Sequence, residues 1–290
     1  MQRHLLVTVS CDSSALNAVR FVAGFFQDKA GLKLTLFHTR SKAFDADMGD
    51  SHEKRQDAMR MADKLKCDAE NALNQAEAQL LELGFSPENM ERKIVPRQYT
   101  LAGDIIRESD SGLYDAIILG RRGVGWLEEA LGGSVSRELL DKRFSCPFWL
   151  CRRADPERQD VLLCVDGSPA SMRMVDHAGF MLSQEPRHDV VLLKVGDEET
   201  PGGLGTDQVM AESREALVQN GVDQERITFL VKDQGDVAKA VLKEADLGDY
   251  AAVGVGRSSV ERGLLARLFT DSVSMDLFRD LSGPCLWISH

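Results

Sequence analysis

Apolar and polar positions along the chain predict short strands and longer helices in alternation. Apolar runs such as residues 32–40 and 114–119 are typical of strands buried on both faces. Between these runs, apolar residues recur every three or four positions, which predicts helices packed on a sheet. Strands that alternate with helices indicate an α/β fold with doubly wound parallel sheets. A ligand of such a sheet is expected at the carboxyl ends of its strands, near the switch point.

The pattern occurs twice. Residues 4–26 read HLLVTVSCDSSALNAVRFVAGFF, and residues 161–182 read VLLCVDGSPASMRMVDHAGFML. Each segment predicts a strand, a turn containing Asp and Ser, and a helix that carries Ala-Gly-Phe towards its end. The polar stretch 154–158 separates the two copies, and 290 residues suit two ordinary domains. We therefore predict tandem domains at residues 1–154 and 155–290.

One long helix distinguishes the first copy. Residues 51–84 predict a continuous helix that ends at Gly84. Its apolar stripe consists of Ala58, Ala62, Leu65, Ala69, Ala72, Ala76, Leu80 and Leu83. The stripe suits a helix lying along its own sheet, or a helix–helix contact in a dimer.

Charge and composition exclude several classes of function. The net charge of −11 lacks the basic footprint of a nucleic-acid-binding protein and disfavours anionic membranes. No apolar run is long enough to cross a bilayer, and the first residues do not resemble a secretory signal. We expect a cytoplasmic protein with neither nucleic-acid nor membrane partners.

The residues that could bind a metal or act in catalysis are not spaced as in a known metal site or catalytic site. The six cysteines and six histidines lack the spacing of a metal site, and reduced, mostly buried thiols are expected. Neither a Ser-His-Asp arrangement, paired carboxylates nor a P-loop lysine is found. We predict no catalytic residue and no metal ligand.

A glycine-spaced segment, Gly120 to Ser136, follows the apolar run 114–119. Gly120 and Gly123 would let the backbone approach a phosphate closely. Gly133 precedes Ser134 at the expected start of a helix, where free N–H groups favour an anion. Charge for that anion could come from Arg121 and Arg122. The alternative is a glycine-turned corner with Ser134 as a simple helix cap.

The spacing of this segment resembles the phosphate-binding motif of the universal stress protein family. It consists of a glycine, two residues, a second glycine, nine residues and then Gly-Ser. Val135 and Ser136, the following Cys-Pro strand, and VDGS at 165–168 extend the resemblance, so the chain is similar to a tandem member. The resemblance implies an adenine nucleotide alpha hydrolase-like fold that binds ATP, ADP or AMP, with or without Mg²⁺. Adenine would lie near His38 and Thr39. The family's acidic residue after the first strand corresponds to Ser10 or, with a one-residue shift, to Asp12.

The nucleotide-binding residues predicted in this way all belong to the first copy. They are Asp12, Thr39, Gly120, Arg121, Arg122, Gly123, Gly133, Ser134, Val135 and Ser136. The second copy keeps Asp166 but has Ser259 in place of one glycine and Asp271 before its serine, where a carboxylate would repel phosphate. We interpret the second site as degenerate.

The last apolar strand of each copy predicts how the copies combine. Residues 147–152 and 284–289 would otherwise form bare sheet edges. Universal stress proteins pair this strand across a dimer two-fold axis, so the two segments should pair here and create an internal pseudo-dimer. A homodimer of the whole chain is a further possibility.

Three functional hypotheses remain. The first is an adenine-nucleotide-binding stress-response or regulatory protein, with at most slow ATP hydrolysis and a possible protein partner. The second is a nucleotide-free interaction scaffold. The third is an ATP pyrophosphatase-type enzyme, whose loop after the first strand is only partly matched by residues 10–14.

Overall fold

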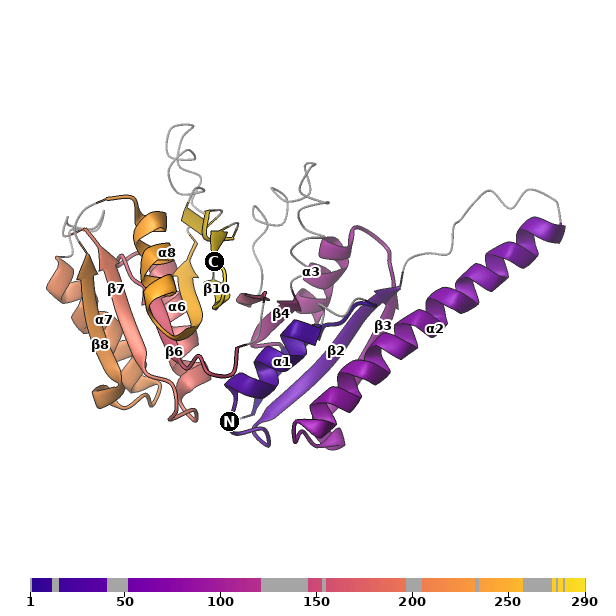
Figure 1. Cartoon of the computed structure of the whole chain (residues 1–290), viewed down its shortest axis with the longest axis horizontal. Coiled ribbons are helices and arrows are strands. Elements are labelled where there is room, and N and C mark those ends of the chain that lie inside the picture. Colours follow the sequence, from indigo (N-terminus) through magenta and orange to yellow (C-terminus); the bar gives the residue numbers. More distant parts are fainter. Residues whose placement is uncertain are drawn as a thin grey trace. The chain divides into compact units, whose positions relative to one another are not determined.

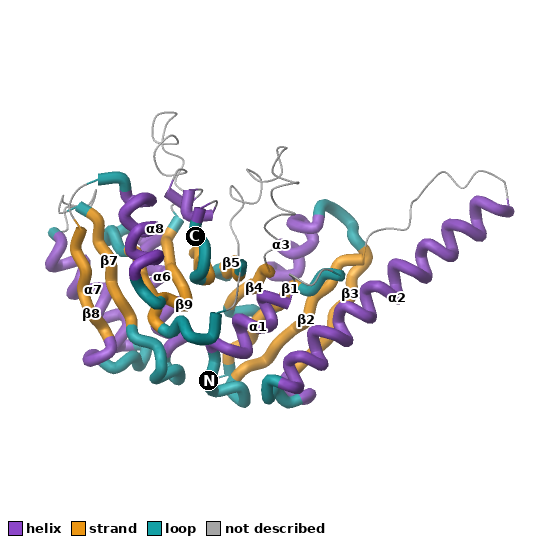
Figure 2. The backbone as a smooth tube through the Cα atoms, in the orientation of Figure 1, coloured by secondary structure: helices purple, strands orange, loops and turns teal. Residues whose placement is uncertain are grey.

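Strands and helices alternate along the chain in each of its two units (Figures 1 and 2). In this computed structural model the described residues are 2–11, 16–40, 52–120, 146–152, 155–196, 205–232, 235–257, 273–274, 276–278 and 280–289. Unit 1 contains Met1–Ala23 and Lys29–Ser145, and unit 2 contains Gly24–Asp28 and Cys146–His290.

Unit 1 has a parallel sheet in the order β3-β2-β1-β4. The strands are β1 (Arg3–Thr8), β2 (Leu32–Arg40), β3 (Met90–Pro96) and β4 (Ala116–Gly120). The helices are α1 (Leu16–Phe25), α2 (His52–Glu82), the 3₁₀ turn η2 (Pro87–Asn89) and α3 (Leu101–Ser111). The consecutive residues Leu5, Leu6 and Val7 are all fully buried, as expected of a strand covered on both faces.

The long helix α2 confirms the predicted continuous helix and shows where its apolar stripe is used. Its second half packs on β2 and β3, with Ala69, Ala76 and Leu80 fully buried. Towards its N-terminus, Met59 and Met61 are 69% and 55% exposed. Figure 1 shows this part of α2 running beyond the strands of unit 1. The stripe therefore serves the helix's own sheet along the second half of α2.

Unit 2 repeats the alternation around a sheet in the order β5-β10-β9-β6-β7-β8. Its strands are β5 (Phe148–Cys151), β6 (Asp160–Cys164), β7 (Val190–Val195), β8 (Ile227–Lys232), β9 (Tyr250–Gly256) and β10 (Cys285–Ser289). Its longer helical elements are α6 (Pro169–Leu182), α7 (Thr206–Gln219) and α8 (Val237–Leu247), with the 3₁₀ turn η3 (Gln224–Arg226). Neighbouring strands run parallel except β5 and β10.

The antiparallel pair β5–β10 confirms the predicted pairing of the two last strands. Trp149 lies opposite Trp287, and the neighbouring residues continue the same register. Strand β5 ends the first sequence copy but is part of unit 2, because it pairs with β10 of that unit. The segment Gly24–Asp28 also clusters with unit 2, where the Phe25 ring stacks on His188 with a centroid distance of 4.0 Å.

Candidate functional site

The switch point of unit 1 lies between β1 and β4. Strand β1 pairs with β2 on one side and with β4 on the other, so the chain changes direction across the sheet here. Gly120 is the last residue of β4 and is buried. This is the edge at which α/β sheets bind ligands, so the structure places Gly120 where the sequence predicted a phosphate loop to begin.

The end of β2 lies beside the end of β1 at the same edge. Thr39 is 7% exposed and pairs with Val95 of β3. The preceding His38 is also buried, and its Nδ1 lies 2.8 Å from the carbonyl oxygen of Val9. Since a carbonyl oxygen only accepts hydrogen bonds, Nδ1 carries the proton and donates it. The structure thus brings Thr39 and this buried imidazole to the predicted adenine side of the edge.

The His38 ring is a neutral polar group. Burial is the main cause of its lowered pKa, the hydrogen bond to Val9 opposes the shift, and the positive charge of Arg97 lowers the pKa further. With Nδ1 donating, Nε2 of the neutral ring is a hydrogen-bond acceptor. No pattern in the sequence indicates this contact, because it depends on the register of β1 against β2.

The loop after β3 completes the described part of this edge. The buried carboxylate of Asp104 accepts hydrogen bonds from the backbone N–H groups of Gln98 and Tyr99, at 3.2–3.3 Å. The Thr100 hydroxyl caps α3 by accepting from the N–H of Gly103 at 3.0 Å. These bonds hold the loop between β3 and α3 in a fixed path.

Most of the predicted nucleotide-binding residues lie outside the described residues. They are Asp12, Arg121, Arg122, Gly123, Gly133, Ser134, Val135 and Ser136. Thr39 and Gly120 are the predicted residues that the structure describes, at the ends of β2 and β4.

The strand registers define which residues of the two units are equivalent. Val9 follows β1 and Val165 follows β6, the first strands of the two sequence copies. Each donates its N–H to the next strand along the chain, β2 or β7, at 2.8 and 2.9 Å. With these two residues superposed, the register of β1 against β4 and that of β6 against β9 place Gly120 and Gly256 at equivalent positions in the two sheets. Aligned by sequence similarity alone, residues 114–120 and 249–254 would instead match Gly120 with Gly254.

Gly256 is required by packing. A Cβ atom on this residue would lie 2.2 Å from the carbonyl carbon of Ala170 and 2.3 Å from the nitrogen of Ser171, in the first turn of α6. Strand β9 therefore ends directly against the backbone of α6. A glycine at this position of the fold has a structural purpose in unit 2 that does not involve a ligand.

Two of the described polar side chains at this edge of unit 2 bond within the turn between β6 and α6. The hydroxyl of Ser168 caps α6 by accepting from Ser171 N–H at 3.2 Å, and Asp166 accepts from Ser168 N–H at 2.9 Å. Val195 occupies the position of Thr39, so the hydroxyl of unit 1 is replaced by an apolar side chain.

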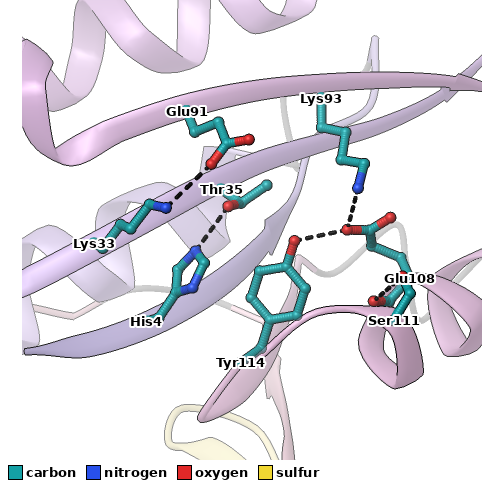
Figure 3. A network of polar contacts seen from close by, with 8 residues as sticks. All are labelled: His4, Lys33, Thr35, Glu91, Lys93, Glu108, Ser111 and Tyr114. Carbon is teal, nitrogen blue, oxygen red and sulfur yellow. Dashed lines mark hydrogen bonds and ion pairs between the residues drawn. The ribbon is translucent and has the colours of Figure 1, made fainter.

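A polar network lies at the opposite edge of unit 1, where β4 begins (Figure 3). The Tyr114 hydroxyl donates to Glu108 at 2.7 Å, and Lys93 Nζ lies 2.7 Å from the same carboxylate oxygen. Burial is the main cause of the raised pKa of Tyr114, and the bond to Glu108 adds to it. The network joins α3 to the sheet at the edge away from Gly120.

Unit 2 repeats this network with Tyr250, Glu244 and Lys232. The Tyr250 hydroxyl donates to Glu244 at 3.1 Å, and Lys232 Nζ lies 2.9 Å from Glu244. Both copies share the sequence pattern behind this network: Glu, three residues, Gly, one residue and Tyr. This pattern is not among the predicted functional motifs. Among the described residues there is no group of three or more His, Cys, Asp or Glu that could hold a metal ion, and no helix suited to spanning a membrane.

The sequence model of the universal stress protein family matches this chain twice, at residues 1–152 and at residues 157–289. The chain belongs to the universal stress protein family. It contains two copies of the family domain in tandem, as the repeat predicted. A search of curated protein sequences found no match.

Solved structures of universal stress proteins share the fold over almost the whole chain. A universal stress protein from Archaeoglobus fulgidus DSM 4304 is 17% identical, with a TM-score of 0.68 over 99% of this chain and 95% of that one. A protein of unknown function from Pseudomonas aeruginosa PAO1 is also 17% identical, with a TM-score of 0.55 over 99% and 92% of the two chains. A family member from Arabidopsis thaliana solved with AMP bound is 19% identical and covers 53% of this chain and 97% of its own, with a TM-score of 0.36. The first two similarities establish the fold.

Proposed function

We propose that this universal stress protein is a regulatory, stress-response protein that binds an adenine nucleotide in its first repeat. The observation that carries the proposal is that the family's glycine motif begins at Gly120, the last residue of β4 at the switch point of unit 1. The phosphates would bind to the backbone N–H groups of Gly120, Gly123 and the helix start at Ser134. Arg121 and Arg122 would supply positive charge that a chain of net charge −11 otherwise lacks.

The base would bind at the end of β2. Adenine offers an amino group and ring nitrogens, and it can be recognised by a neutral acceptor and a hydroxyl. His38 and Thr39 supply these groups, since the ring of His38 is held neutral by burial and Nδ1 is already bonded to Val9. Asp12 follows β1 and would face the ribose. The roles proposed for these residues are all binding roles, and we propose binding of ATP, ADP or AMP as the primary activity.

We favour unit 1 over unit 2 because the described groups at the matching edge of unit 2 either pack within that unit, bond within their own turn or are apolar. Gly256 is packed against α6, Asp166 and Ser168 bond within the turn, and Val195 replaces Thr39. Ser259 stands three residues after Gly256, where Gly123 follows Gly120. We propose that the second repeat supports the first and that bound nucleotide alters a surface for a protein partner.

Titration of the purified full chain with ATP and AMP, followed calorimetrically, tests the proposal. A valine side chain at Gly123 would fill the space where the backbone approaches the phosphate, so Gly123→Val should weaken binding at least about tenfold, or 1.4 kcal/mol. Ser259→Val is the matched control, because it changes the equivalent position of the second repeat and should leave the affinity unchanged.

Three results would count against the proposal. Equal binding by wild type and Gly123→Val would remove the glycine loop from the site, and loss of binding in Ser259→Val would move the site to the second repeat. Absence of binding by wild type, with no nucleotide carried through purification, would favour the scaffold hypothesis. Circular dichroism of each variant verifies that the fold is retained.

A further inference from the structure

The two strands that end the sequence copies bring two cysteines into contact. Cys151 ends β5 and Cys285 begins β10, and their Sγ atoms lie 3.0 Å apart. Both side chains are buried, with 1% and 2% exposure, and both are free thiols. The two residues are 134 positions apart in the chain, so the contact is created entirely by the pairing of these strands.

The strand register gives this pair the geometry that a disulfide requires. Leu150 lies opposite Leu286 in the antiparallel ladder, and the next step of the same register sets Cys151 opposite Cys285. Directly opposed residues of antiparallel strands have Cα atoms about 4.5–5.5 Å apart. Disulfides span Cα separations of about 4.4–6.8 Å, so a bond could form with little movement of the backbone.

We propose that Cys151 and Cys285 are a reversible redox site, at which a peroxide forms a disulfide that joins β5 to β10. One thiol loses its proton, its thiolate attacks hydrogen peroxide, and the O–O bond breaks to leave a sulfenic acid on that cysteine and a hydroxide ion. The hydroxide takes up the released proton and leaves as water. The second thiol attacks this sulfur, a second water leaves, and the S–S bond forms. Two thiols are oxidised as one hydrogen peroxide is reduced to two waters, and a thiol reductant reverses the change.

The surroundings of the pair set the rate of the reaction. Burial raises the pKa of the Cys285 thiol well above its usual value, and contact with Cys151 raises it further. Because the thiolate is the attacking form, oxidation should be slow at neutral pH and faster at higher pH. Once one cysteine is oxidised, however, the other already lies in contact with it, so ring closure should outrun trapping from solution.

The disulfide would stabilise unit 2 against unfolding. It would close a loop of more than a hundred residues between β5 and β10, which restricts the unfolded chain. The oxidised protein should therefore unfold at a higher urea concentration than the reduced protein. This inference does not depend on nucleotide binding.

Peroxide treatment of the full-length Cys11→Ser/Cys67→Ser variant tests the proposal, because Cys11 and Cys67 are exposed and would react on their own. After remaining thiols are alkylated, tryptic peptides are analysed without reduction. We expect the peptide of residues 144–152 to be linked to that of residues 280–290. Residues 144–152 also contain Cys146, so the link must persist when Cys146→Ser is added and disappear when Cys151→Ser is added.

A sulfenic-acid trap provides the second readout. Cys151→Ser and Cys285→Ser should each accumulate trapped sulfenic acid on the remaining cysteine, while the protein with both thiols should form the disulfide and show the upward shift in urea midpoint. The proposal is overturned if both cysteines remain free to alkylation, after unfolding, under conditions that oxidise Cys11 and Cys67 in wild type. It is also overturned if Cys285 is linked to a different cysteine.

Discussion

The indole rings of Trp149 and Trp287 stack face to face across the β5–β10 pair, with centroids 4.0 Å apart and planes inclined by 8°. Both residues are fully buried. Phe25 packs edge-on against both rings, which brings the segment Gly24–Asp28 into the same cluster. The cluster explains why the segment and β5 belong to unit 2 although both come from the first sequence copy.

Removal of one indole should strongly destabilise unit 2. We expect Trp287→Ala to lower the free energy of unfolding by about 3–5 kcal/mol, because it deletes a large buried ring and leaves a cavity. Urea denaturation followed by far-ultraviolet circular dichroism measures the change. Leu113→Ala is the control, since Leu113 is 93% exposed and its truncation should change stability by less than about 0.5 kcal/mol. Similar midpoints for the two variants would contradict this account of the core.

The half-buried His177 should make unit 2 sensitive to acid. Its Nε2 accepts a hydrogen bond from Trp149 Nε1 at 3.1 Å, so this nitrogen is unprotonated, and burial lowers the pKa of His177 to about 3. In the unfolded state His177 takes up a proton below a pH of about 6.5, whereas in the folded state it takes up that proton only near pH 3. The stability contributed by His177 is therefore fully present above a pH of about 6.5 and is lost progressively as the pH falls towards about 3.

The variant His177→Gln isolates this effect. Glutamine can still accept from Trp149 but does not titrate, so its urea midpoint should fall less steeply between pH 6.5 and pH 4. The difference between the two slopes cancels the contribution of all other groups. Parallel slopes for wild type and variant would show that His177 does not contribute to the pH dependence.

A methyl group at Gly256 should distort the junction of β9 with α6. Gly256→Ala places Cβ against the backbone of Ala170 and Ser171, which cannot move aside as a side chain could, and we expect a loss of about 1–3 kcal/mol. Gly235→Ala serves as the control, because no atom lies within 4 Å of its added Cβ. A thermal or urea midpoint for Gly256→Ala equal to that of the control would contradict the close packing.

The tyrosine–glutamate bonds should contribute to stability without affecting ligand binding. Tyr114→Phe removes the donor to Glu108 at the edge opposite Gly120, and we expect a loss of about 1–2 kcal/mol with unchanged nucleotide affinity. Tyr250→Phe, the equivalent change at Glu244, should cost a similar amount. A change in affinity in Tyr114→Phe, measured by the calorimetric titration above, would show that the two edges are coupled.

Local sequence patterns determined the class of fold and its duplication. Apolar periodicity, glycines and helix caps act between near neighbours in the chain, so the alternation of strands and helices could be recognised in each copy without coordinates. The pairing of the two last strands was also predictable, because each would otherwise expose an apolar edge and because the resemblance to universal stress proteins implies pairing of this strand. The glycine motif and VDGS were sufficient to identify the family, which the match over both copies confirmed.

Contacts between distant residues were decided only by the tertiary structure. The bond from His38 to Val9, the contact of Cys151 with Cys285 and the approach of Gly256 to α6 all depend on strand register or on the packing of a helix against a strand. A one-residue slip of a strand would turn these side chains to the opposite face. The sequence therefore determined which elements form and that they form twice, while packing between them selected which polar groups, thiols and glycines meet.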